Sequence, residues 1–245
     1  MISFLISAIK IVFLLGFLIG IHETGHFLIA KLCKVRINEF AIGFGPVIWK
    51  KQGKETKYEL RLIPLGGFVN MEGEAEQSEK EGSFTKASIP RRVAIVAAGA
   101  LVNIIFAIIV YFILAMTVRG DLTNAVVGNR VLDADNFGNR LYFASYNTKE
   151  FMLSIAESVK QLFTGKVSSA EIVGPVGISE VVAKTNGFRE FIYILSAISI
   201  SLGVTNLLPF PPLDGGKIVL VLIEAITKKK VSEKVELTIS YIGLG

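Results

Sequence analysis

The segment 22–26, His-Glu-Thr-Gly-His, contains residue types whose spacing could do chemistry. On a helix, His22 and His26 leave the same face one turn apart, with about 5–6 Å between their Cβ atoms. Two imidazoles so placed can bind one zinc ion, and Glu23 then lies beside the metal, where it can take a proton from a water molecule. These are the only two histidines in the chain.

A short match of this kind also occurs by chance on structural helices, so the surrounding sequence has to decide between the two interpretations. Residues 2–21 contain a single charged residue, Lys10, and about 20 apolar residues suffice to cross a bilayer. Ionisable groups in such a span cost about 2.5–3.5 kcal/mol each at its centre and are candidates for function. A zinc ion would give both imidazoles a partner, which favours the metal site. We expect Lys10 to reach toward water or another helix, without a catalytic role.

A third metal ligand is predicted near the other end of the chain. Residues 206–216 contain three prolines and two glycines within eight positions, which must interrupt a helix. Asp214 follows this break, and a catalytic zinc site uses three protein ligands plus an open position for water. Asp214 could instead cap the next helix. Capping and metal binding use different lone pairs, so the sequence leaves both roles open.

The composition is that of a membrane protein. Hydrophobic residues make up 51% of the 245 positions, and the mean hydropathy is +0.56. Long apolar runs cover 2–30, 93–118 and about 190–210, and a shorter one covers 213–227. We therefore predict a mainly α, polytopic membrane protein with three complete transmembrane helices and a partial fourth. The single Cys33 excludes an internal disulfide or a cysteine metal cluster.

The distribution of charge predicts the orientation in the membrane. Residues 31–92 carry twelve Lys and Arg against eight acidic residues, and 228–234 are also basic. Residues 119–189 are nearly balanced, with eight basic and seven acidic residues. The positive-inside rule places the first two segments in the cytoplasm and the third outside. The basic bias is thus explained by topology, and we expect no nucleic-acid partner.

A small antiparallel β-sheet is predicted at the membrane face over residues 35–74. Residues 35–38 and 58–62 alternate apolar with polar side chains, as strands do, and 50–54 form a polar turn between them. An open sheet edge at this position could pair with an unwound substrate strand. The alternative is a hairpin with a purely structural role.

The other segments carry weaker signals. Residues 72–92 are predicted to be a cytoplasmic loop, and Asn103 in the second apolar run to hydrogen-bond to a neighbouring helix. Residues 119–150 are predicted to be an irregular external connection, with short strands within it as an alternative, followed by an amphipathic helix from about 152 to 165 and a turn at 174–177. The expected division is a membrane core at 1–118, an external connection at 119–189, and a membrane core at 190–245 with the third-ligand motif and a truncated last helix.

Taken together, these motifs resemble the site-2 protease family of zinc intramembrane metalloproteases, in particular its bacterial branch that cleaves membrane-bound anti-sigma factors. The motifs that carry the resemblance are His22–His26, Phe40–Pro46, Gly66–Val69, Gly174–Ile178 and Asn206–Gly216. They follow the family's order over most of the chain. One difference is the external connection, which is too short for the PDZ domains usual in that branch.

The resemblance implies that His22, His26 and Asp214 bind Zn²⁺ and that Glu23 is the catalytic base. It also implies that Asn206 and the sheet, with Gly43 and Gly67 in its motifs, hold an unwound substrate. The expected substrate is a single-span membrane protein such as an anti-sigma factor. The expected location is the inner (plasma) membrane, with the active site near the cytoplasmic side.

Two other functions are compatible with parts of the sequence. A catalytically silent zinc-binding scaffold could bind membrane-spanning partners without cutting them, but it would not need the glutamate of the motif. A metal transporter would need several polar groups along a path through the membrane, and the second apolar run offers only Asn103 and Thr117. We therefore predict an intramembrane zinc endopeptidase.

Overall fold

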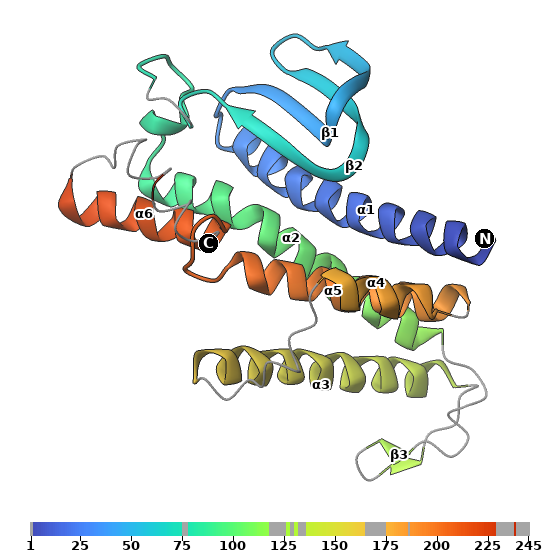
Figure 1. The fold of residues 1–245 in the computed structure, drawn as a ribbon. Helices are drawn as coiled ribbons and strands as arrows, with labels where there is room; N and C mark the ends of the chain where they lie inside the picture. The colour runs from blue at the N-terminus through green and yellow to red at the C-terminus, as the bar shows by residue number, and fades with distance from the viewer. Residues whose placement is uncertain are drawn as a thin grey trace. The chain divides into compact units, whose positions relative to one another are not determined.

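The computed structural model describes residues 2–74, 78–117, 126–127, 130–131, 136–164, 175–185, 187–228 and 238. Its elements, in chain order, are shown in Figure 1: α1 (Ile2–Leu32), β1 (Ile37–Gln52), β2 (Lys57–Met71), the 3₁₀ turn η1 (Phe84–Lys86), α2 (Ile89–Met116), β3 (Val126–Val127), β4 (Arg130–Val131), α3 (Phe137–Phe163), α4 (Pro175–Ala183), α5 (Phe188–Asn206) and α6 (Asp214–Thr227).

Three of these helices are long and apolar enough to cross a membrane: 5–32 in α1, α2, and α5. They correspond to the three long apolar runs of the sequence, so this part of the prediction is confirmed. A helix suits such a segment because, away from its two ends, it pairs the backbone N–H and C=O groups with one another where no water is present. α5 ends at Asn206 and α6 begins at Asp214, as the intervening prolines predict. The predicted truncated last helix lies outside the described residues.

The described residues form two compact units. One comprises 9–104 and 201–245 and contains most of α1, the hairpin, the first half of α2, the end of α5, and α6. The other comprises 1–8 and 105–200 and contains the start of α1, the second part of α2, β3, β4, α3, α4 and most of α5. The division at 1–118, 119–189 and 190–245 expected from the sequence stays a prediction.

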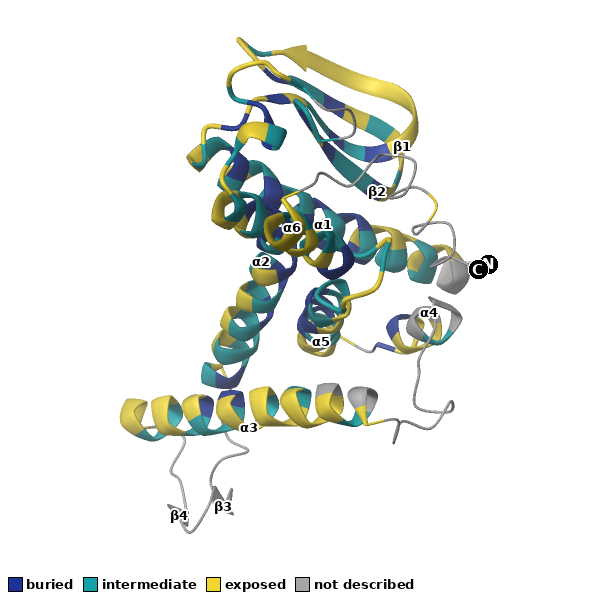
Figure 2. Ribbon diagram, turned by 90° about the vertical axis from the view of Figure 1, so that its left-hand side faces the viewer, coloured by how far each residue is buried: buried dark blue, intermediate teal, exposed yellow. Residues whose placement is uncertain are grey.

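The predicted sheet after the first helix is confirmed as a hairpin of β1 and β2. Residues 39–42 pair with 67–70 and also with 57–60, while 49–52 pair with 57–60. Residues 39–42 therefore lie inside the sheet and 67–70 at one edge of it. Residues 44–52 are exposed (Figure 2). The turn spans 53–56 and is closed by a hydrogen bond from Gly53 N–H to the Thr56 carbonyl, so 50–52, expected in the turn, belong to β1.

A cluster of charged side chains binds the hairpin together. Lys57, Glu59 and Arg61 share one face of β2, because side chains two residues apart point to the same side of a strand. The Glu59 carboxylate is buried and pairs with Lys57 and with Arg61, whose Nη2 lies 2.7 Å away. Arg61 also reaches Glu39 on β1 at 3.1 Å. The Lys57 ammonium, helped by the other hydrogen bonds, lowers the pKa of Glu59 to about 2.

The amphipathic helix expected to end near Gly165 is present as α3, which ends at Phe163. Two details of the 119–189 segment were predicted wrongly. α3 begins at Phe137, not near 152, because Asn136 acts as a cap: its side-chain oxygen accepts from the Gly138 N–H at 2.8 Å. The polar residues taken as a sign of irregular structure thus start a helix. Residues 175–177, expected in a turn, form the first turn of α4, where Pro175 fits because the first helical residue needs no N–H partner. Gly174 lies outside the described residues.

Candidate metal centre

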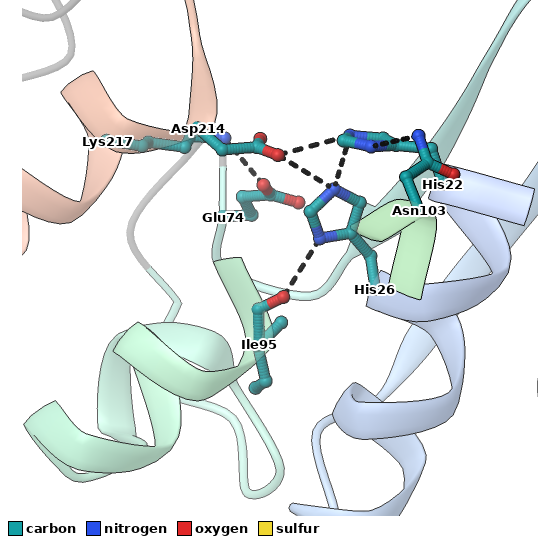
Figure 3. A network of polar contacts seen from close by, with 7 residues as sticks. All are labelled: His22, His26, Glu74, Ile95, Asn103, Asp214 and Lys217. Atoms are coloured by element: carbon teal, nitrogen blue, oxygen red, sulfur yellow. Dashed lines mark hydrogen bonds and ion pairs between the residues drawn. The ribbon is translucent and has the colours of Figure 1, made fainter. Parts of the chain in front are cut away.

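The two histidines lie side by side on α1 and face the start of α6 (Figure 3). Their Nε2 atoms are 3.2 Å apart. Oδ2 of Asp214 lies 3.1 Å from Nε2 of His22 and 3.4 Å from Nε2 of His26. Both histidines are buried, and the Asp214 side chain is 18% exposed. Residues 188 positions apart in the sequence thus place three ligand atoms around one point.

The spacing of these three atoms fits a zinc ion. Zinc binds nitrogen and carboxylate oxygen at about 2.0–2.1 Å in a tetrahedron, which separates neighbouring ligand atoms by about 3.3 Å. The three observed separations fall on either side of that value. The set of two imidazoles and one carboxylate also leaves a fourth position open, as catalytic zinc sites require.

Asp214 is not the cap of α6. The N-cap is Leu213, and Asp214 is the first residue of the helix. A carboxylate in the first turn is still favourable, because the free N–H groups there carry partial positive charge. Its Oδ2 is directed at the two imidazoles. The alternative in which Asp214 only caps a helix is therefore not what the structure presents.

The remaining nitrogen of each imidazole contacts α2. Nδ1 of His26 lies 2.9 Å from the carbonyl oxygen of Ile95, and Nδ1 of His22 lies 3.5 Å from Nδ2 of Asn103 (Figure 3). Asn103 is fully buried, and its contact with α1 agrees with the interhelical hydrogen bond expected from the sequence. Both Nε2 atoms are thereby turned toward Asp214.

A cavity of about 190 Å³ opens beside the three ligand atoms. Glu23 lines it, as do Gly67 and Val69 from the β2 edge. Gly67 approaches Glu23 closely: a Cβ at this position would lie 2.9 Å from Cγ of Glu23. The motif glutamate, the candidate metal ligands and a strand edge thus border one space.

Of the three residues expected to hold substrate, only Gly67 borders the cavity among the described residues that line it. Gly43 lies in the buried bend of β1 with φ +94°, and Asn206 ends α5; neither is among the described residues that line the cavity. Their role in holding substrate stays a prediction.

An ion pair at the cavity was not predicted from the sequence. Nζ of Lys217 lies 2.6 Å from Oε1 of Glu74, and both residues line the cavity. A local signal existed for Lys217, since it lies one helical turn after Asp214. Glu74 carried no such signal, because it lies in the charged segment 72–92, for which the sequence predicts a cytoplasmic loop.

Comparison with known proteins agrees with this centre. The sequence profile of Peptidase family M50 matches residues 10–245. A Clostridium acetobutylicum protein named as a zinc metalloprotease is 31% identical, over 89% of this chain and 87% of its own length. A Fusobacterium nucleatum protein of the same name is 30% identical, over 91% and 89%. The Escherichia coli regulator of sigma-E protease RseP is 42% identical over 118 residues, which cover 46% of this chain and 26% of that protein.

The chain belongs to peptidase family M50, the site-2 protease family. It is a membrane metalloendopeptidase of the zinc-dependent class. The alignment with the Clostridium protein runs over 294 positions, more than the 245 residues of this chain, so that relative contains residues that this chain lacks. The absence of a full PDZ domain stays a prediction.

Proposed function

We propose that this protein hydrolyses peptide bonds within the membrane-spanning segments of single-span membrane proteins, with His22, His26 and Asp214 as zinc ligands and Glu23 as general base. The observation that carries the proposal is the triangle of three ligand atoms beside the cavity that Glu23 lines. Anti-sigma factors are the proposed substrate class, supported by the similarity to a protease named as a regulator of sigma-E.

Zinc, when bound, supplies a Lewis acid that polarises the scissile carbonyl and acidifies water. The chain itself supplies the base. The Glu23 carboxylate takes the proton of the attacking water and delivers it to the leaving amine. Its proximity to the candidate ligands is supported by the cavity, which Glu23 lines together with His22, His26 and Asp214.

The strand edge supports the binding of an unwound substrate. Residues 67–70 are paired on one side by 39–42, and Gly67 and Val69 border the cavity. A substrate segment pairing with this edge would present its backbone to the ligands, and an extended conformation exposes the peptide bond that a helix shields. Because Gly67 has no side chain, Glu23 can lie directly against this edge: a Cβ at Gly67 would be 2.9 Å from Cγ of Glu23.

The proposed location is the bacterial inner membrane, with the site near the cytoplasmic side. The proposal is supported by the position of His22 and His26 in the last third of α1 and by the basic residues that follow it at 31–92.

The test is cleavage of a co-expressed single-span substrate by Glu23→Gln. This change removes the base but keeps the size and leaves the three ligands in place. We expect zinc to stay bound and cleavage to fall by at least about 10²-fold. The control is Glu55→Gln. Glu55 is exposed and pairs with Lys31, and this variant should cleave normally. Normal cleavage by Glu23→Gln would show that the base is assigned wrongly.

A further inference from the structure

One face of α2 meets both imidazoles at three positions spaced four residues apart. The Ile95 carbonyl lies against His26, the Asn103 amide lies against His22, and Gly99 stands between them. Residues four apart share one face of a helix, so a single stripe of α2 forms this wall. Figure 3 shows Ile95 and Asn103 on either side of the histidine pair.

Gly99 keeps the middle of the wall open. A Cβ at this position would lie 2.4 Å from Nε2 of His26 and 2.8 Å from Nε2 of His22. Real side chains do not approach so closely, so even alanine would push the imidazoles away from the position in which their Nε2 atoms converge. The glycine therefore does more than allow close helix packing.

Ile95 and Asn103, at the two ends of the stripe, influence which nitrogen of each imidazole carries the proton. A neutral imidazole has one N–H, and a nitrogen that binds metal cannot carry it. With both Nε2 atoms facing Asp214, the proton belongs on Nδ1, which then needs an acceptor. The Ile95 carbonyl can only accept a hydrogen bond, so it fixes this form of His26.

Asn103 can act on His22 in either of two ways. Its amide presents a nitrogen to His22 Nδ1 in the structure, and a rotation of 180° would present the oxygen instead. A fully buried amide in an apolar helix is costly unless its hydrogen bonds are used. An acceptor oxygen is what a metal-bound His22 requires.

We propose that the Ile95–Gly99–Asn103 stripe is a positioning cradle, in which Asn103 holds His22 in its Nδ1–H form by turning its amide oxygen toward the ring when zinc binds. This inference rests on the proposed function, because it assumes that the imidazoles bind zinc through Nε2. Groups that hydrogen-bond to the second ring nitrogen of a metal-binding histidine orient that ligand, and their loss typically weakens metal binding about 10–100-fold.

The test uses the fact that the chain has two histidines, so ¹⁵N-histidine labelling yields the signals of two imidazoles. In zinc-loaded wild type, both rings should show a protonated Nδ1 and a metal-bound Nε2. Asn103→Leu should weaken zinc binding about 10–100-fold in a chelator competition and alter the His22 signals while sparing those of His26. Asn103→Asp keeps an acceptor oxygen and should restore the Nδ1–H signal.

Two matched controls separate the cradle from general damage. Asn147→Leu removes an asparagine of α3 that bonds to its own helix at Phe143, and it should leave zinc affinity unchanged. Gly99→Ala should lose zinc, whereas Gly20→Ala, where the nearest atom to the new Cβ is 3.7 Å away, should keep it.

The outcomes distinguish the two proposals. Zinc-loaded wild type together with an Asn103→Leu variant of equal affinity and identical His22 signals would overturn the cradle and leave the proposed function standing. Zinc bound through Nδ1 of either ring would also overturn the cradle. A wild-type protein that binds no zinc would overturn the proposed function itself.

Discussion

Lys217 on α6 and Glu74 after β2 form an ion pair of 2.6 Å across the candidate metal cavity. Lys217 lies one turn after Asp214, and Glu224 lies two turns after Lys217, so all three share one face of α6. Glu224 pairs with Arg92 of α2, also at 2.6 Å. The helix that carries the candidate carboxylate ligand is therefore held by ion pairs at two points on the face that presents it, and we expect both pairs to help position Asp214.

Loss of the Lys217–Glu74 ion pair should weaken the positioning of Asp214 at the candidate metal site. Lys217→Gln leaves Glu74 without its cation, and the pair is partly exposed, so we expect a loss of about 1–2 kcal/mol in unfolding free energy, between the values for exposed and buried pairs. Zinc affinity should fall with it. Thermal unfolding in detergent and chelator competition measure the two effects.

The charge-reversed double variant Lys217→Glu with Glu74→Lys should recover part of both losses, because it restores an opposite-charge pair. Lys31→Gln, which breaks an exposed pair with Glu55, is the control. If Lys217→Gln matched this control in both measurements, the Lys217–Glu74 ion pair would have no role in placing Asp214.

Loss of the Arg92–Glu224 ion pair should destabilise the protein more than loss of the Lys217–Glu74 pair. Arg92 and Glu224 have side chains only 12% exposed, and the Arg92 guanidinium also lies 5.0 Å from the centre of the Phe84 ring. Glu224→Gln leaves that cation buried without its counter-charge, which costs about 3–5 kcal/mol for a fully buried pair. We expect a clear fall in thermal stability in detergent. Glu180→Gln, in an exposed pair with Lys184 at 3.9 Å, should show almost none.

Much of this arrangement is encoded in short-range sequence patterns. The spacing of His22 and His26 predicts a shared helix face, and the prolines before Asp214 predict the break between α5 and α6, after which a new helix starts at Asp214. The alternation around residues 58–62 predicts a strand. Each of these signals depends on neighbours within a few positions, which is why the sequence reveals them.

The parts that were missed depend on distant partners or on caps. The Lys217–Glu74 pair joins residues 143 positions apart, and no local periodicity encodes such a contact. Asn136 looks like a loop residue until its side chain is seen to cap α3. The close approach of Gly99 to the imidazoles appears only once α1 and α2 are placed together.

The hairpin should respond to pH through Glu59. Its pKa in the folded protein, about 2, lies below the ordinary value of 4.5 because of the Lys57 ammonium first and the other hydrogen bonds second. A lowered pKa means that this carboxylate stabilises the fold fully above the ordinary value, and that the contribution is lost as the pH falls toward the folded value.

The measurement is the difference in unfolding temperature between wild type and Glu59→Gln, followed from about pH 6 down to about pH 2. The wild-type advantage should be constant near neutrality and shrink through the acidic range. An advantage that stayed the same at every pH would mean that the charge of Glu59 does not contribute.

Zinc stoichiometry of the purified protein tests the central claim most directly, because it asks whether two distant motifs form one metal centre. We expect about one zinc per chain in wild type and a loss of bound zinc in both His22→Ala and Asp214→Ala, since each removes one of three protein ligands. Glu55→Ala, an exposed acidic residue outside the cavity, should keep its zinc. Full zinc occupancy in Asp214→Ala would contradict the account, because the carboxylate would then have no part in holding the ion.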